Sequence, residues 1–99
     1  MLVYKVNILE ELKKIGYSTY RLQKKAPGDE NVIMGSSQVH KLKSGEMIGI
    51  NTLSTVCGLL NRQPGDLIGY IPDEQYDSLY ESGYFRDKGI PASPRKKDK

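Results

Sequence analysis

The chain has one cysteine, Cys57, and one histidine, His40, and these two residues limit the chemistry that its side chains can perform. A lone cysteine can form neither an internal disulfide nor a cysteine-based metal cluster, and a lone histidine cannot build a multi-histidine metal site. The spacing gives no support to a nucleophilic Cys57–His40 pair, and no orienting acid can be assigned to it. We therefore predict no enzymatic activity, no bound metal and no cofactor.

The segment Gly35–Lys43 combines residue types that can recognise the edges of DNA bases. If it is helical, only Val39 and Leu42 are spaced for burial, and the turn Ser36–Gln38 exposes hydroxyls and an amide at the helix start. Short hydroxyls approach base edges closely, an amide can pair with adenine, and a lysine can reach guanine acceptors. The free backbone amides of a helix start also favour a nearby phosphate. An ordinary capped and solvated surface helix fits the same composition equally well.

Length, composition and charge describe one small basic domain. The 99 residues correspond to a single domain, and 37% hydrophobic against 27% charged residues allow a modest core but no deep substrate cavity. Residues 1–72 hold nine basic and six acidic side chains, which account for the whole net charge of +3. Such a charge permits an anionic partner without requiring one.

No feature of the sequence points to a membrane. No stretch is long and apolar enough to span a bilayer. The opening residues Met-Leu-Val-Tyr-Lys lack the charged-then-apolar order of a secretion signal. We therefore expect a cytoplasmic protein without membrane contact.

The first part of the chain shows the apolar spacing of helices. A first helix is expected at Ile8–Ile15, where apolar residues recur at helical intervals. Asn7 can cap its start and Gly16 can end it. A second, short helix is expected at Ser18–Lys25. The segment Ala26–Asn31 is rich in turn-forming residues and is predicted to be a loop.

The rest of the chain adds further helices. Gly45 is expected to end the helix Gly35–Lys43, and a fourth helix is expected at Asn51–Leu60. This fourth helix has four apolar residues on one face: Leu53, Val56, Cys57 and Leu60. Pro64 suits the first turn of a fifth helix, Pro64–Tyr70. Strand-like alternation is limited to Met1–Val6, so the sequence predicts a compact all-α bundle of four or five helices.

Beyond Pro72, an aromatic stripe at helical spacing follows Asp73, which can cap it. Its members are Tyr76, Leu79, Tyr80 and Tyr84. The stripe fits three roles: folding back on the bundle, which we favour, self-association, and binding of another protein. The last ten residues, Ile90–Lys99, hold two prolines and five charges, and we expect them to form a mobile basic tail.

Several other residues have a structural and a functional interpretation. Tyr17, Tyr20 and Tyr70 are scattered, so we expect them to pack at the core edges rather than to stack on single-stranded nucleic acid. Cys57 is expected to act as a small hydrophobic residue, with redox sensing as the alternative. His40 is expected to be a surface residue that approaches the DNA backbone on binding, with a pH-sensitive contact as the alternative.

Taken in order along the chain, three motifs resemble the phage-repressor-like (XRE or Cro-type) helix-turn-helix family, and most closely its short Firmicute-type branch. The resemblance covers Val6–Ile71 and rests on Tyr17–Leu22, Met34–Glu46 and Asn61–Ile68. The last motif is the most specific, because a polar pair followed by Pro-Gly-Asp and two apolar residues closes this fold. The resemblance implies a lambda-repressor-like domain at residues 1–72, and the aromatic stripe and the tail composition then predict a short helical or packed extension at 73–89 and the tail at 90–99.

In this family the third helix lies in the major groove, which implies two sets of contacts. The residues expected to contact bases are Ser36, Ser37, Gln38 and Lys41. The residues expected to contact the DNA backbone are Thr19, Arg21, His40, Lys43 and Ser44. Base contacts set sequence preference, and phosphate contacts set register and affinity.

One segment departs from the family pattern. The turn before the third helix usually has roughly three or four residues, whereas Ala26–Met34 has nine. The added residues either bulge away from the DNA, because surface loops tolerate insertion, or tilt the third helix.

The resemblance therefore implies a sequence-specific transcriptional regulator, a bacterial or phage-type repressor, with double-stranded DNA as its partner. A homodimer is a further expectation, motivated by the aromatic stripe. The alternative function is an antitoxin or adaptor with the same fold that binds a protein partner through Tyr76–Tyr84.

Overall fold

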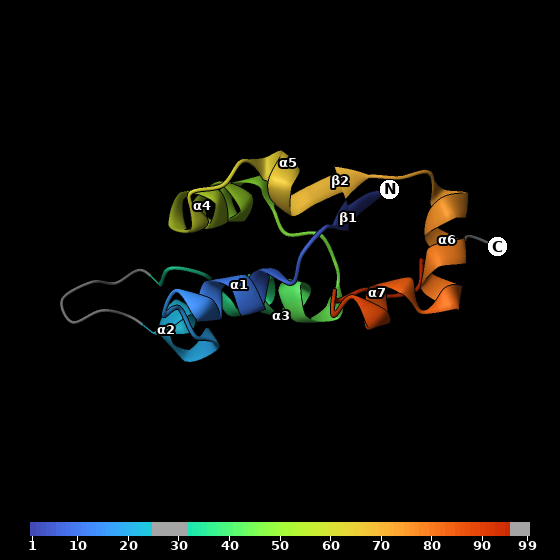
Figure 1. The fold of residues 1–99 in the computed structure, drawn as a ribbon. Helices are drawn as coiled ribbons and strands as arrows, with labels where there is room; N and C mark the ends of the chain where they lie inside the picture. Colours follow the sequence, from blue (N-terminus) through green and yellow to red (C-terminus); the bar gives the residue numbers. More distant parts are fainter. Residues whose placement is uncertain (25–31, 96–99) are drawn as a thin grey trace.

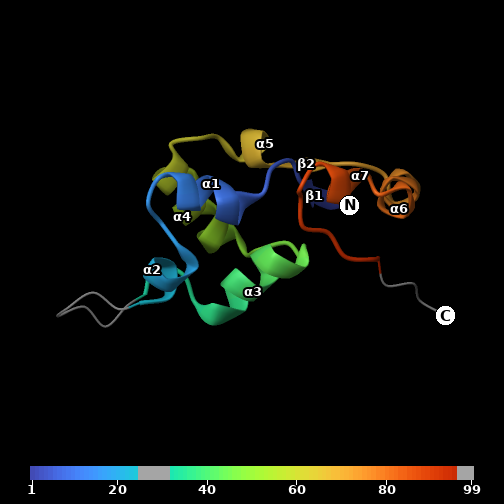
Figure 2. The same cartoon turned by 60° about the horizontal axis from the view of Figure 1, so that its bottom comes forward.

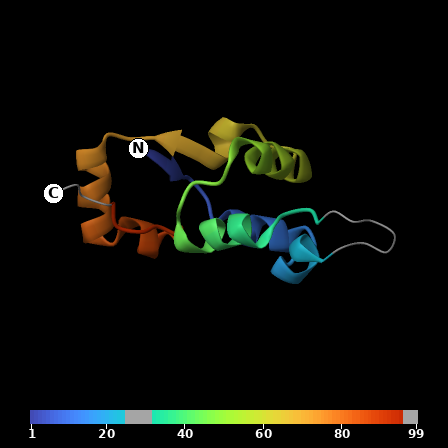
Figure 3. The ribbon, with the colours of Figure 1, turned by 180° about the vertical axis from the view of Figure 1, so that it is seen from behind.

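The computed structural model describes residues 1–24 and 32–95, which form a mostly helical domain with one small sheet (Figure 1). In chain order the elements are β1 (Leu2–Tyr4), α1 (Ile8–Lys14), α2 (Thr19–Gln23), α3 (Ser36–Ser44), α4 (Ile50–Leu60), α5 (Pro64–Leu67), β2 (Ile68–Tyr70), α6 (Asp73–Ser82) and α7 (Tyr84–Asp87). In Figures 1 and 3, α4, α5 and the sheet form one layer, α1, α2, α3 and α7 form the other, and α6 closes one end.

The helix boundaries follow the local signals in the sequence. The Asn7 side chain accepts a hydrogen bond from the Glu10 amide at 3.2 Å and so caps α1. Ser18 caps α2 in the same way, through the Arg21 amide at 3.3 Å. Gly45 ends α3 with a φ of 89°, a left-handed conformation that costs glycine little. The four predicted helix positions are therefore confirmed, although α2 ends at Gln23 rather than at Lys25, which lies outside the described residues.

The fifth predicted helix, Pro64–Tyr70, is wrong in its second half. The helix α5 spans only Pro64–Leu67, and the chain turns extended at Ile68 to form β2. β2 pairs antiparallel with β1, with Tyr4 opposite Ile68 and Leu2 opposite Tyr70. The Lys5 amide extends this pairing by donating to the Leu67 carbonyl at 2.8 Å. Local spacing could not reveal this strand, because its partner is the strand-like segment at the other end of the domain.

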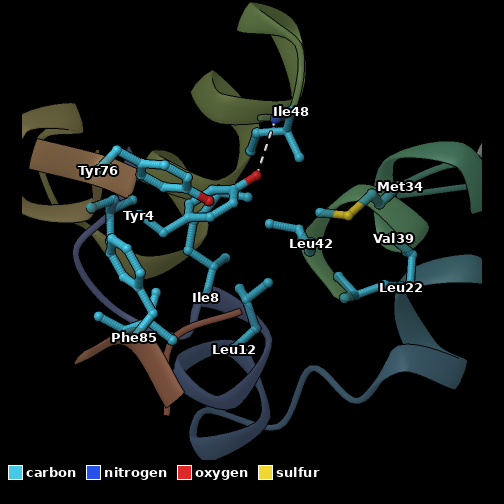
Figure 4. Close-up of a cluster of buried hydrophobic side chains, with 13 residues drawn as sticks. Tyr4, Ile8, Leu12, Leu22, Met34, Val39, Leu42, Ile48, Tyr76 and Phe85 are labelled. Atoms are coloured by element: carbon cyan, nitrogen blue, oxygen red, sulfur yellow. Dashed lines mark hydrogen bonds between the residues drawn. The ribbon is translucent and has the colours of Figure 1, made fainter. Parts of the chain in front are cut away.

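One hydrophobic core runs through the whole domain (Figure 4). Its buried side chains are Tyr4, Ile8, Leu12, Leu22, Met34, Val39, Leu42, Ile48, Val56, Leu67, Tyr76, Phe85 and Ile90. Leu53, Cys57 and Leu60 pack against this cluster, so the predicted apolar face of α4 is confirmed. Within the described residues, no helix is long and apolar enough to cross a membrane.

Two of the three tyrosines expected at the core edges are elsewhere. Tyr17 does pack against the core. Tyr20 and Tyr70 are 71% and 70% exposed, because they lie on the solvent side of α2 and at the end of β2. The sequence alone could not show that these two positions face the solvent, because it does not show which other elements cover them.

The chain beyond Pro72 shares this core. Tyr76 in α6 and Phe85 in α7 have ring centroids 5.2 Å apart and are 3% and 5% exposed. Residues 90–95 do not leave the domain as the sequence suggested, since Ile90 is only 8% exposed and the segment continues along α6. The rest of the expected tail, residues 96–99, lies outside the described residues.

Candidate nucleic-acid interface

Helix α3 faces the solvent along most of its surface. Only Val39 and Leu42 are buried, each 2% exposed. Ser36, Ser37, His40 and Lys43 are exposed, and Gln38, Lys41 and Ser44 are partly buried. Gly35 precedes the helix and provides no side-chain cap. The first turn of α3 therefore presents free backbone amides together with two serine hydroxyls.

Helix α2 lies beside α3 and is tied to the approach of that helix (Figure 2). Leu22 is fully buried, and its carbonyl accepts a hydrogen bond from the Met34 amide at 3.0 Å. The chain thus returns to α2 immediately before α3 begins. Most of the long loop Ala26–Met34, and with it the expected bulge or tilt, lies outside the described residues, which omit residues 25–31.

The start of α2 holds one arginine in a defined position. The guanidinium of Arg21 donates to the Gly16 carbonyl at 3.1 Å and lies 4.5 Å from the centroid of the Tyr17 ring. Thr19, the first residue of α2, is partly buried next to the Ser18 cap. The arginine is exposed at the same time, so its charge is oriented but still available to a ligand.

The charges on these two helices have a single sign. Neither α2 nor α3 contains an acidic residue, whereas they carry Arg21, Lys41 and Lys43. Among the described residues, no acidic side chain forms a salt bridge with any of these three cations. An acid-free surface of this kind favours a polyanionic partner.

Two polar side chains fix the segment between α3 and α4. The Gln38 side-chain carbonyl accepts a hydrogen bond from the Gly49 amide at 2.8 Å. The Tyr4 hydroxyl donates to the Glu46 carbonyl at 2.6 Å and accepts from the Ile48 amide at 3.0 Å (Figure 4). Burial raises the pKa of Tyr4 to about 12. Sequence reasoning missed Tyr4, because a hydroxyl that bonds across more than forty residues leaves no local pattern.

The aromatic stripe beyond Pro72 is divided between core and surface. Tyr76 is buried, and Leu79 packs against the core. Tyr80 and Tyr84 are 37% and 39% exposed. The stripe thus folds back on the domain and leaves two half-exposed rings. Within the described residues, no group of three His, Cys, Asp or Glu side chains could hold a metal ion.

Two short helices that share a core, the second presenting its polar first turn to solvent, define the helix-turn-helix class of DNA-binding domains. A model of the Cro/C1-type HTH DNA-binding domain matches residues 7–73, about two thirds of the chain, and the chain belongs to this family. A search of curated proteins and a search of solved structures found no match. The family match confirms the predicted XRE/Cro-type relationship, and with it a DNA-binding regulator with a helix-turn-helix fold.

Proposed function

We propose that this protein is a sequence-specific transcriptional regulator that inserts α3 into the major groove of double-stranded DNA. The observation that carries the proposal is how the residues of α3 are divided between the core and the solvent. Only Val39 and Leu42 serve the core, and the other side chains are polar or basic and at least partly exposed. Hydroxyls, an amide and basic side chains on one exposed helix are the groups that can contact base edges and phosphates when that helix lies in the major groove.

Four residues are proposed to contact base edges: Ser36, Ser37, Gln38 and Lys41. The two serines are exposed in the first turn of α3, where short hydroxyls can approach the bases closely. Ser37 and Lys41 are four residues apart and therefore share a helix face. Because the carbonyl of Gln38 already accepts from Gly49, its amide nitrogen is the group that can donate to a base.

Five residues are proposed to contact the DNA backbone: Thr19, Arg21, His40, Lys43 and Ser44. The position of Arg21 supports this role, because Gly16 and Tyr17 orient its guanidinium before any ligand arrives. Such preorganisation reduces the entropy lost on binding. Each cation that neutralises a phosphate also makes the affinity depend on salt.

The protein is also proposed to bind as a dimer to two half-sites about one helical turn, roughly 34–36 Å, apart. The half-exposed rings of Tyr80 and Tyr84 provide apolar surface for this self-association. Sedimentation at tens of micromolar, with and without DNA, measures the association. A monomeric mass under both conditions would contradict the dimer.

The experiment that tests the function is binding to random-sequence duplex DNA at two salt concentrations, followed by selection of the bound sequences. Salt-dependent binding that enriches one motif is expected. Binding without enrichment would contradict sequence reading by α3. No binding even at low salt would contradict the DNA-binding role and leave a protein partner at Tyr80 and Tyr84 as the alternative.

A further inference from the structure

The extension beyond the matched family region returns to the recognition helix. After α7, residues 90–95 form a segment that we call the C-terminal strap, and it lies beside the C-terminal end of α3 (Figures 1 and 2). The Ile90 amide donates to the Phe85 carbonyl at 2.9 Å, and the Ile90 side chain is buried. The Tyr76 hydroxyl donates to the Ser93 carbonyl at 2.5 Å. The strap is thus held at its start and in its middle.

An ion pair holds the far end of the strap. Arg95 donates from Nε and Nη2 to the two carboxylate oxygens of Asp77, at 3.3 and 2.9 Å. The Arg95 and Asp77 side chains are only 31% and 26% exposed. A forked pair that is partly shielded from water has a more defined geometry than a surface pair between flexible side chains.

The strap passes directly over the residue that ends α3. The Gly45 amide donates to the Lys41 carbonyl at 3.0 Å and so closes the last turn of the helix. A side-chain carbon at Gly45 would overlap the backbone of Ala92. Glu46 and Met47, which follow α3, line one pocket together with Ser93 and Pro94 of the strap.

We propose that the C-terminal strap, clamped by Asp77 and Arg95, is a positioning element that holds the C-terminal end of α3 for DNA recognition. The proposal rests on the proposed role of α3 in reading DNA. It gives the extension beyond residue 73 a part in recognition, although neither Asp77 nor Arg95 lies on the reading face of α3. Residues that fix a recognition element contribute through the geometry of the residues that touch the ligand.

The loss of a negative charge and the loss of positioning predict opposite changes in DNA affinity when Asp77 is replaced. Asp77→Ala removes one negative charge, so electrostatics alone predicts tighter binding to DNA. It also removes the forked pair that holds Arg95 and leaves only the longer contact of Arg95 with Asp73, at 3.8 Å, so positioning predicts weaker binding to the specific sequence. Glu81→Ala is the matched control, because Glu81 is an exposed acid on the same helix.

The experiment compares these two variants with the wild-type chain on the selected DNA sequence and on random DNA. We expect Asp77→Ala to bind the selected sequence about 3- to 10-fold more weakly, the range that the loss of one such hydrogen-bonded pair supports. Random DNA should bind equally or slightly more tightly. Glu81→Ala should match or slightly exceed the wild type on both. Equal or tighter binding of the selected sequence by Asp77→Ala would overturn the proposal.

Amide hydrogen exchange tests the same clamp without DNA. In Asp77→Ala the Gly45 amide should exchange about 3- to 10-fold faster, because the end of α3 opens locally, while the Leu12 amide in α1 should keep its rate. Unchanged exchange at Gly45 would also overturn the proposal. If the wild type selects no DNA sequence, the proposed function fails, whereas the exchange result still decides whether the strap fixes α3.

Discussion

Individual polar side chains set the position of the recognition helix as much as apolar packing does. Tyr4 of β1 bonds to both Glu46 and Ile48, and Gln38 of α3 bonds to Gly49, so side chains from these two elements hold the turn after α3. Backbone groups in a turn need partners when they are shielded from water. The path of the chain from α3 to α4 therefore depends on these few hydrogen bonds.

Tyr4→Phe should destabilise the fold by about 1–3 kcal/mol, because it leaves the Ile48 amide without its partner in a buried position. Urea denaturation measures this loss. Tyr20→Phe is the control, since Tyr20 is 71% exposed, and it should stay within about 0.5 kcal/mol of the wild type. Equal effects of the two variants would show that the Tyr4 hydroxyl contributes no stability.

The same hydroxyl gives stability a dependence on alkaline pH. Burial raises the pKa of Tyr4 from 10.0 to about 12. Because the pKa is raised in the folded state, the contribution of the neutral Tyr4 hydroxyl to folding stability is complete below pH 10. It is lost as the pH rises toward 12. Tyr4→Phe should therefore lose less stability than the wild type over this interval, as measured by urea denaturation at several pH values. Parallel curves would contradict this linkage.

Lys41 and Lys43 should differ in what their removal costs. Lys41→Ala is expected to weaken binding to the selected sequence by about 1–3 kcal/mol while affecting random DNA less, because it removes a base contact. Lys43→Ala is expected to weaken both alike and to lower the salt dependence. Titrations on both DNAs measure these effects. Equal losses on both DNAs for both variants would show that the reading face is assigned wrongly.

At the scale of elements, the sequence was informative wherever a signal was local. Asn7, Ser18 and Gly45 mark helix ends by their own chemistry, and the structure places helix ends at all three. The strand β2 was missed because its partner is β1, more than sixty residues away. The candidate site divides similarly. The spacing of Val39 and Leu42 predicts which residues of α3 face the solvent. The hydrogen bond between Gln38 and the Gly49 amide leaves no such local pattern.

The contact between α1 and the turn after α4 should respond to acid. Glu11 pairs with Lys14 and Arg62, at 2.8 Å each, and these hydrogen bonds lower its pKa below the ordinary value of 4.5. Because the pKa is lowered in the folded state, the contribution of the ionised Glu11 carboxylate to folding stability is present above pH 4.5. It is lost as the pH falls through the lowered value. Glu11→Gln should therefore lose less stability than the wild type on acidification from about pH 5 to pH 3.

Thermal unfolding across that pH interval measures the effect. Glu10→Gln is the matched control, since Glu10 is an exposed acid one position earlier on the same helix. It should keep the acid dependence of the wild type. If Glu11→Gln kept it as well, the ion pairs of Glu11 would make no net contribution to folding.

At the scale of the whole molecule, the family match and the folded unit have different extents. The matched region ends at residue 73, where α6 begins. The core continues beyond it, because Tyr76, Phe85 and Ile90 belong to the same buried cluster as Tyr4 and Ile8. We therefore propose that the folding unit reaches Arg95, beyond the domain boundary predicted after residue 72.

Ending the chain after residue 72 should consequently abolish stable folding. The truncation removes the buried side chains of Tyr76, Phe85 and Ile90 and exposes the core surface that they cover. A single buried Phe→Ala change costs about 3–5 kcal/mol, against a total stability of about 5–15 kcal/mol for a typical domain. A chain ending after Arg95 keeps all three side chains and the Asp77 pair, so it should unfold cooperatively near the temperature of the full chain. Circular dichroism during heating distinguishes the two. A cooperative transition at a similar temperature for residues 1–72 would show that the bundle folds alone and that the extension only docks on it.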